Sequence, residues 1–199
     1  DDGVGIPSSE LELAFQRHAT SKLGTEEQLE AVATLGFRGE ALPSIAAVSH
    51  LAMTSRPLKA EAGHRIDLIW GKQFRVGPQG CPAGTLVDVS DLFGNMPARR
   101  KFLKSRPVET ARVHELLSRY ALAYPAVRFR LVSDGRRLLT TPGNGKPEET
   151  LLAVYGPEVA NGMLEVHGED PETGYQVDGF VSAPSLHRSN RTYMTFFVN

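Results

Sequence analysis

The sequence predicts an α+β fold with its helices on one face of a sheet, and three observations support this prediction. Residues 108–124 carry apolar side chains at helical spacing, which is typical of a long amphipathic helix. Short runs rich in β-forming residues lie between residues 51 and 89, separated by glycine and proline. Asp134-Gly135 joins two further runs of this kind, as expected for a β-hairpin.

Short helical patterns precede the strands. Residues 9–18 place three apolar side chains on one helical face, and a serine at the start can cap the helix. These apolar residues are Leu11, Ala14 and Phe15. Thr25 and Gln28 stand three residues apart, which is the spacing of a capping box, and they predict the start of a second helix.

A glycine turn, Gly36-Phe37-Arg38-Gly39, leads into a third helical pattern that ends near Ser49-His50 and tolerates Pro43 in its first turn. Such a turn can bind a phosphate group, because its N–H groups are accessible and the helix dipole favours negative charge. Taken alone, such a turn is more often a plain connection. The phosphate hypothesis therefore depends on other segments that complete a nucleotide site.

The remaining elements follow in order along the chain. Strands are expected at residues 51–56, 65–70, 73–76 and 85–89. The long helix ends before Pro125, and residues 128–133 and 137–141 form the hairpin. The apolar stripe of the long helix is expected to be Val113, Leu116, Leu117, Tyr120, Ala121 and Tyr124.

A domain boundary is predicted at residues 142–147, Pro-Gly-Asn-Gly-Lys-Pro, because this stretch is dense in turn-forming residues. We therefore expect one domain over residues 1–145 and a second over residues 146–199. The second domain is predicted to contain a helix at 148–155 and strands at 163–166, 175–181 and 193–198. The chain opens directly on Asp1-Asp2-Gly3 and closes inside a strand-like run, so we expect a fragment whose second domain is incomplete.

The composition narrows the class of protein. The chain is 41% hydrophobic and 23% charged, as in an ordinary globular protein. Its net charge of −1 excludes a surface that is basic as a whole, so any contact with nucleic acid needs a local basic patch. Neither a signal peptide nor an apolar run long enough to span a membrane is present. One cysteine, Cys81, excludes an internal disulfide, and the six dispersed histidines have no zinc-type spacing.

Two further segments carry chemistry that suits a nucleotide. In Asp1-Asp2-Gly3-Val4-Gly5-Ile6, a carboxylate can accept a hydrogen bond from an exocyclic amine, and the glycines let a ring lie against the backbone. In Gly84-Thr85, the hydroxyl can serve a base or a water molecule. The alternatives are an ordinary Asp-Gly turn and a buried strand start. The sequence lacks the Gly-x-x-x-x-Gly-Lys-Ser/Thr and Gly-x-Gly-x-x-Gly patterns.

Four motifs in order closely resemble the N-terminal ATPase region of the DNA mismatch repair MutL family. They are Asp1-Asp2-Gly3-Val4-Gly5-Ile6, His18-Ala19-Thr20-Ser21-Lys22-Leu23, Gly36-Phe37-Arg38-Gly39-Glu40-Ala41-Leu42 and Asp91-Leu92-Phe93-Gly94-Asn95-Met96-Pro97-Ala98-Arg99-Arg100-Lys101-Phe102-Leu103. Phe197-Val198-Asn199 is similar to the start of a further strand of that family. The resemblance implies a two-layer α/β sandwich ATPase domain, of the type shared with gyrase, a heat-shock chaperone and sensor histidine kinases, which binds ATP with Mg²⁺.

The resemblance also implies roles for residues of each motif. Asp1 would bind the adenine amino group, partly through water, with Gly5 beside the ring, Gly3 in the same turn and Thr85 near the same end. The mobile lid would include Thr20, Ser21 and Lys22. The phosphates would be wrapped by Gly36, Phe37, Arg38, Gly39, Glu40, Ala41 and Leu42. Asp2 departs from the family, which often has Asn there.

The family's catalytic Glu and Mg²⁺-binding Asn precede the Asp-Gly motif, so neither a catalytic nor a metal-binding residue is assigned to these 199 residues. We therefore expect the segment alone to hydrolyse ATP poorly or not at all, whereas the parent protein is an ATPase.

The basic residues Arg99, Arg100 and Lys101 are candidates for contact with DNA phosphates, although a solvated helix start would look the same. The resemblance implies a cytoplasmic, ATP-driven clamp that dimerises through its N-terminal domains and engages the mismatch-recognition protein MutS and DNA. The alternatives are another ATPase of the same superfamily and a DNA-binding module with a degenerate nucleotide site.

Overall fold

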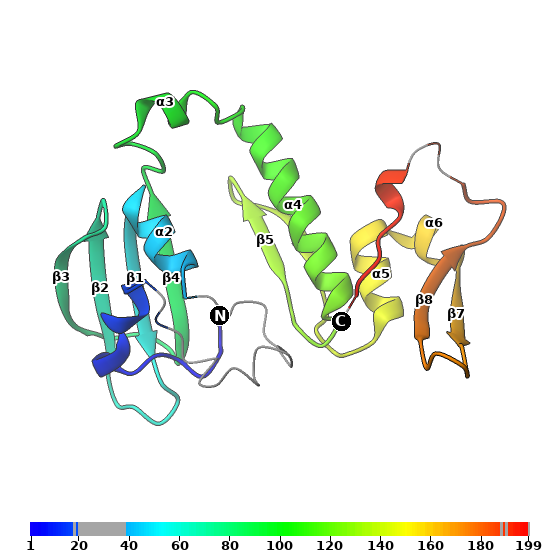
Figure 1. Ribbon diagram of the computed structural model, residues 1–199, viewed down its shortest axis with the longest axis horizontal. Helices are drawn as coiled ribbons and strands as arrows, with labels where there is room; N and C mark the ends of the chain where they lie inside the picture. Colours follow the sequence, from blue (N-terminus) through cyan, green and yellow to red (C-terminus); the bar gives the residue numbers. More distant parts are fainter. Residues whose placement is uncertain (18, 20–38, 188, 190, 199) are drawn as a thin grey trace. The chain divides into compact units, whose positions relative to one another are not determined.

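The computed structural model describes residues 1–17, 19, 39–187, 189 and 191–198 (Figure 1). These residues form two compact units, Asp1–Leu103 and Lys104–Asn199, which are described separately below. The two compact units meet between Leu103 and Lys104, whereas the sequence predicts a domain boundary between residues 145 and 146. The predicted domain boundary stays a prediction. None of the helices described is long and apolar enough to cross a membrane.

The first unit is built on a four-stranded antiparallel sheet. Its strands, in the spatial order β3-β2-β1-β4, are β1 (His50–Arg56), β2 (Gly63–Ile69), β3 (Lys72–Gln79) and β4 (Gly84–Ser90). The predicted strands are therefore confirmed, with ends that differ by a few residues. Turn residues between the runs, including Trp70-Gly71 with positive φ at both positions, allow the chain to reverse between neighbouring strands.

One face of this sheet is apolar and carries the helical layer, which Figure 1 shows as α2 (Ala41–Ala47) and the blue N-terminal turns. Successive strand residues point to opposite faces, so alternate side chains of β1 and β2 reach the core. The core consists of Leu11, Ala46, Leu51, Met53, Ile66 and Leu68. The opposite face is polar: Arg65 forms an ion pair of 2.7 Å with Asp67, and this hydrogen bond raises the pKa of Arg65.

The N-terminal segment corrects one prediction. Residues 9–18 do not form a continuous helix; the structure has two short 3₁₀ turns, η1 (Ser8–Glu10) and η2 (Leu13–Phe15). Pro7 stands at the start, no side chain caps either turn, and Gln16 turns to an extended backbone that ends the second one. A segment this short gains too little from helix propagation to offset nucleation. The expected packing face is nevertheless present, because Leu11 is fully buried.

The third helical pattern is confirmed as α2, with Pro43 in its first turn. Its C-terminal carbonyls are satisfied by two distant turns. Gly71 N–H donates to the Ala46 carbonyl at 2.8 Å, and Phe93 N–H donates to the Val48 carbonyl at 2.7 Å. The helix predicted to start at Thr25 lies outside the described residues.

The second unit has a long helix, α4 (Arg106–Ala123), and two separate hairpins. Its other elements are β5 (Arg130–Ser133), β6 (Arg136–Thr140), α5 (Pro147–Tyr155), α6 (Pro157–Ala160), β7 (Met163–Glu169), β8 (Gln176–Ser182) and η3 (Arg191–Tyr193). The long helix, the Asp134-Gly135 hairpin, the helix at 148–155 and the strands at 163–166 and 175–181 are confirmed. Both residues of the hairpin turn have positive φ, as an Asp-Gly turn requires.

The buried face of α4 differs from the predicted stripe. Ala121 is fully buried and Ser118 nearly so, whereas Val113 is 45% and Leu116 is 54% exposed. The helix contacts α5 and the β5–β6 hairpin, and these neighbours lie against the side that carries Ser118 and Ala121. Apolar spacing therefore located the helix and its buried Ala121, but it wrongly included the exposed Val113 and Leu116 and missed Ser118.

The expected strand at residues 193–198 is wrong for the described residues. They contain the end of η3 and then a segment that is neither helix nor strand. A strand exists only through hydrogen bonds to a neighbouring strand. The backbone hydrogen bond from Met194 N–H to the Arg191 carbonyl, at 3.0 Å, is instead local.

Candidate nucleotide-binding site

The first unit brings Asp1 and Thr85 together, although they are far apart in sequence. The Asp1 nitrogen donates to the Thr85 carbonyl at 2.7 Å, and Thr85 N–H donates to the Asp1 carbonyl at 3.1 Å. Two residues that exchange both hydrogen bonds lie directly opposite each other, with their side chains on the same face of the ladder. The carboxylate and the hydroxyl that were predicted at one end of a nucleotide are therefore neighbours.

Two glycines make this approach possible. Gly84 has a φ of +108°, and a Cβ there would lie 2.1 Å from the Asp1 carbonyl oxygen. Gly5 has a φ of +72°, and a Cβ there would lie 2.3 Å from the Arg56 carbonyl oxygen. Any other residue at either position would push the N-terminal segment off the sheet and strain the backbone. The predicted importance of Gly5 thus has a steric cause independent of any ligand.

The Asp1 carboxylate is held in place by its own turn. Gly3 N–H donates to Asp1 Oδ1 at 3.1 Å, which closes a short side-chain turn. A carboxylate oxygen has several acceptor positions, so this bond leaves further positions for a ligand donor. Both Asp1 and Asp2 are exposed, and they lie next to each other at the edge of the sheet.

Ser55, which no sequence motif singles out, links the N-terminal segment to β4. It is buried at 1% exposure, and its Oγ accepts from Ile6 N–H at 2.8 Å. The same Oγ lies 3.0 Å from the Gly84 carbonyl oxygen and 2.8 Å from Thr85 Oγ1. A sequence signal for it did exist: strand alternation places Ser55 on the face of Leu51 and Met53, where a polar side chain needs partners.

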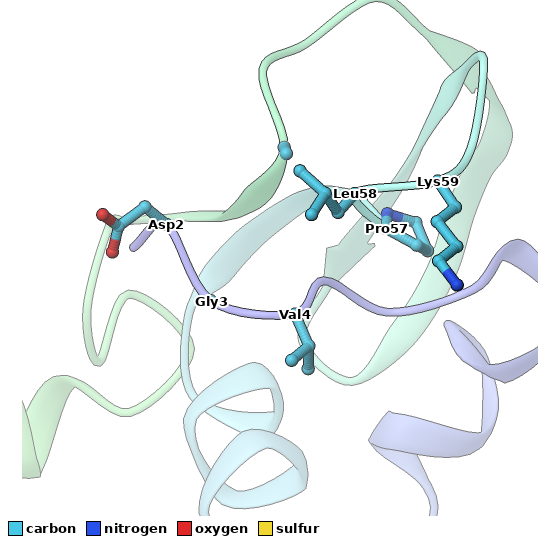
Figure 2. A pocket seen from close by; sticks show the side chains of 7 residues that line it. Asp2, Gly3, Val4, Pro57, Leu58 and Lys59 are labelled. Carbon is cyan, nitrogen blue, oxygen red and sulfur yellow. The ribbon is translucent and has the colours of Figure 1, made fainter.

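A cavity of about 480 Å³ opens beside the N-terminal segment (Figure 2). It is lined by Asp2, Gly3, Val4, Pro57, Leu58, Lys59 and Ala83. The neighbouring Arg56 holds two loops, because Nε donates to the Cys81 carbonyl at 2.8 Å and Nη1 donates to the Ala60 carbonyl at 2.9 Å. Gly3 is the member of the predicted site that lines this cavity.

The predicted phosphate-binding stretch is described from Gly39 onward. Gly39 has a φ of +63°, and a Cβ there would lie 2.3 Å from the Ala19 carbonyl oxygen. Glu40 stands at the N-cap of α2, Ala41 begins the helix and Leu42 packs against the core. The other predicted ATP-binding residues, Thr20, Ser21, Lys22, Gly36, Phe37 and Arg38, lie outside the described residues.

The basic candidates lie at the end of the first unit. Arg99 and Arg100 belong to α3 (Pro97–Arg100), and Lys101 stands at its C-cap. All three are exposed. Arg100 Nη1 lies 3.4 Å from Asp91 Oδ1, so part of its charge is offset by a carboxylate. An exposed pair of this kind contributes little to stability and leaves the guanidinium accessible.

Known proteins resemble this chain in sequence and in fold. The family model described as "DNA mismatch repair protein, C-terminal domain" matches residues 151–199. The DNA mismatch repair protein MutL of Desulforudis audaxviator is 48% identical over the whole chain, which spans 35% of that protein. The MutL of Desulforamulus reducens is 45% identical, and the chain spans 31% of it.

Solved structures show the same likeness. The "Aquifex aeolicus MutL ATPase domain complexed with ADP" matches with a TM-score of 0.68 at 32% identity, over 92% of this chain and 62% of that one. The "N terminal domain of a DNA repair protein" matches with a TM-score of 0.74 at 25% identity, over 96% of this chain and 60% of that one. The predicted α+β fold of the ATPase-domain type is confirmed by these matches. Because the likeness in sequence and fold extends over essentially its whole length, this chain belongs to the MutL family of DNA mismatch repair proteins.

Proposed function

We propose that this chain is the ATP-binding part of a mismatch repair protein that works as an ATP-driven, dimerising clamp. The clamp couples recognition of a mismatch to the later steps of repair. Relatives of the chain are DNA mismatch repair proteins, and one matched domain is described as an ATPase domain in complex with ADP. The proposal concerns a whole protein, of which the chain spans about a third, judged by a coverage of 35% and 31% in two relatives.

The pairing of Asp1 with Thr85 carries this proposal. It sets a carboxylate and a hydroxyl side by side at the start of β4, where an exocyclic amino group can donate to both. Gly5 lets the N-terminal segment pass close to the end of β1, and the proposal places the ring beside this segment. Along the same face of β4, Val87 and Val89 are each 42% exposed and offer an apolar surface to a base.

At the other end of the nucleotide, the stretch from Gly36 to Leu42 binds the phosphates in this proposal. Backbone N–H groups before α2 supply the hydrogen bonds, and Gly39 supplies the left-handed conformation that lets the chain turn there. Thr20, Ser21 and Lys22 form the lid. An ordered lid then favours dimerisation through the N-terminal domains, which is an order–disorder switch.

Mg²⁺ accompanies the phosphates when ATP is bound and neutralises their charge. Among the residues that the structure describes, no group of three His, Cys, Asp or Glu side chains could hold a metal ion. For the 199 residues by themselves we expect little or no ATP hydrolysis in a steady-state assay, because the resemblance assigns the general base and the metal ligand to other residues.

The partners in this proposal are DNA, the mismatch-recognition protein MutS and a second copy of the protein, in the cytoplasm and at the nucleoid. Arg99, Arg100 and Lys101 are the DNA-binding candidates, because they are exposed cations in one short stretch. Reversal of the charge at Arg99 and Lys101 should weaken DNA binding and reduce its dependence on salt. Unchanged affinity and salt dependence would remove this stretch from the interface.

Replacement of the Asp1 carboxylate tests the nucleotide site directly. In the full-length protein, Asp1→Ala should weaken ATP binding by about tenfold or more, since hydrogen bonds to charged groups are worth about 1.5–3 kcal/mol. Titration calorimetry measures this change. The matched control is Asp2→Asn, which alters the neighbouring carboxylate and restores the residue that the family often has; it should bind ATP at least as well as the wild type.

The two variants separate the possible results. Equal loss of binding in both would mean that charge near the N-terminal segment matters, but not the contact made by Asp1. No nucleotide binding by the wild-type protein would contradict the proposed function.

A further inference from the structure

Ser55 occupies the centre of a hydrogen-bond network that joins Asp1's segment to β4. Its register partner across the sheet is Thr85, so the two hydroxyls face each other on the same side of neighbouring strands. Ser55 is buried at 1% exposure, whereas Thr85 is only partly buried and therefore partly exposed to solvent. The network therefore has one inner hydroxyl and one hydroxyl that a ligand can reach.

The number of protons fixes the direction of the hydrogen bonds. Ser55 Oγ already accepts from Ile6 N–H at 2.8 Å, and its single proton can go either to the Gly84 carbonyl at 3.0 Å or to Thr85 Oγ1 at 2.8 Å. A carbonyl oxygen can only accept. All three contacts are made at once only if Ser55 donates to Gly84 and Thr85 donates to Ser55. Buried polar groups favour the arrangement that satisfies them all.

In this arrangement the Thr85 hydroxyl donates its proton to Ser55 Oγ. Its accessible side then carries lone pairs alone, so Thr85 acts toward a ligand as an acceptor. The Asp1 carboxylate, on the same face, is also an acceptor when ionised. The site thus presents two acceptors side by side, which complement a group with two N–H donors and repel a carbonyl oxygen.

We propose that Ser55 is a positioning residue that holds the Thr85 hydroxyl as an acceptor and thereby makes the site select a 6-amino purine over a 6-oxo purine. The inference rests on the proposed nucleotide-binding function and deepens it. Ser55 itself does not touch the nucleotide. It acts through the direction of one hydroxyl proton, and loss of Ser55 frees that proton to turn toward the ligand.

Two nucleotides that differ at position 6 test this role. ATP carries an amino group there, and inosine triphosphate carries an oxo group. Dissociation constants of both are measured by calorimetry for the full-length wild-type protein and for Ser55→Ala. The preference for ATP should fall by about three- to tenfold in Ser55→Ala, because the freed Thr85 hydroxyl can then donate to the oxo group of inosine triphosphate, whereas beside Ser55 it can only accept.

A buried serine of the same unit provides the matched control. Ser49 is fully buried and donates from Oγ to the Ile45 carbonyl at 2.7 Å, away from Thr85. Ser49→Ala should leave the ratio of the two dissociation constants unchanged. If Ser55→Ala lowers both affinities by one factor, or leaves the ratio as in the wild type, the positioning role is overturned while the proposed function stands.

Thr85→Val gives a second route if Ser55→Ala folds poorly. It removes the accessible hydroxyl and should by itself reduce the preference for ATP. In the Thr85→Val background, Ser55→Ala should then cause no further change in the ratio, because its effect passes through Thr85. A further change of the ratio in the double variant would overturn the inference. A wild-type protein that binds neither nucleotide would contradict the proposed function itself.

Discussion

The two units of this chain differ in how they bury apolar side chains. In the first, Leu51, Met53 and Ile66 are each 1% exposed and belong to one core between the sheet and the helical layer. In the second, the buried apolar residues are Ala121, Leu139 and Leu151, and they share the interior with Ser118, Thr141 and Thr150. The second unit also has two separate two-stranded sheets instead of one continuous sheet.

This difference bears on where a precise site can be built. A two-stranded hairpin is marginal by itself, whereas a four-stranded sheet with a covered face holds its strands in fixed register. Asp1, Ser55 and Thr85 are all fixed by the first unit, through strand register and hydrogen bonds to a buried serine. The comparison predicts that substitutions in the first unit have the larger effects.

The largest effect is expected from truncation of the core. Leu51→Ala should reduce the local stability of β1 by about 2–5 kcal/mol, because a large cavity would open in a well-packed cluster. Leu151→Ala in the second unit should cost less, at the lower end of that range, because its surroundings are smaller and more polar. Hydrogen exchange of the amides of β1 and α5 measures both. A larger loss at Leu151 would reverse the comparison.

A smaller effect, but one aimed at the site, is expected from Gly84→Ala. The new Cβ would meet the Asp1 carbonyl, so this substitution should cost about 1–3 kcal/mol and weaken ATP binding with it. Gly77→Ala, in β3, is the control, since a Cβ at Gly77 would have no atom within 4 Å. Melting temperature and ATP affinity that fell equally in both variants would argue against the proposed approach of Asp1 to β4.

Substitutions on α4 refine the comparison inside the second unit. Ala121→Leu adds bulk on the fully buried side and should destabilise the unit by about 1–3 kcal/mol. Leu116→Ala, at a residue 54% exposed, should change stability by no more than about 0.5 kcal/mol. Urea unfolding followed by near-ultraviolet circular dichroism compares the two. A larger loss of stability for Leu116→Ala than for Ala121→Leu would show that the predicted apolar stripe, and not the side of Ala121, is the buried face of α4.

The smallest effect concerns charges at the start of α5. A hydrogen bond from Lys146 lowers the pKa of the Glu149 carboxyl below its usual 4.5, and a hydrogen bond from Asn144 lowers it further. A lowered pKa favours the folded state above the unfolded value, and this contribution is lost as the pH falls through the folded value. In Lys146→Met, the pKa of Glu149 should return toward 4.5 in an NMR titration. Asp170, whose pKa is lowered by Thr173, should titrate as before.

Much of the fold could be predicted because its causes are local. Alternating apolar residues and intervening glycines predicted the strands of the first unit. In the second unit, Asp134-Gly135 predicted the β5–β6 hairpin, because both turn positions need positive φ. The motif residues Asp1 and Thr85 were assigned to one end of a nucleotide through family resemblance. Their pairing across β4 agrees with that assignment, while their contact with a ligand stays a prediction.

The features that were missed depend on contacts between distant segments. Which side of α4 is buried depends on where α5 and the β5–β6 hairpin lie, and helical spacing does not contain this information. Ser55 matters because Ile6 of the N-terminal segment and Gly84 and Thr85 of β4 converge on it from two distant segments. Residues 193–198 have the composition of a strand, but a strand also needs a neighbour to pair with.

Hydrogen exchange with and without ATP tests the central claim most directly. In the full-length protein, ATP should slow exchange in three separate peptides: the one that begins at Asp1, the one that spans Gly36 to Leu42, and the one around Thr85. These peptides carry the proposed adenine and phosphate contacts. Slowed exchange in all three is the result that the account predicts. Binding of ATP with no change at Asp1 or Thr85, or with changes confined to the second unit, would contradict it.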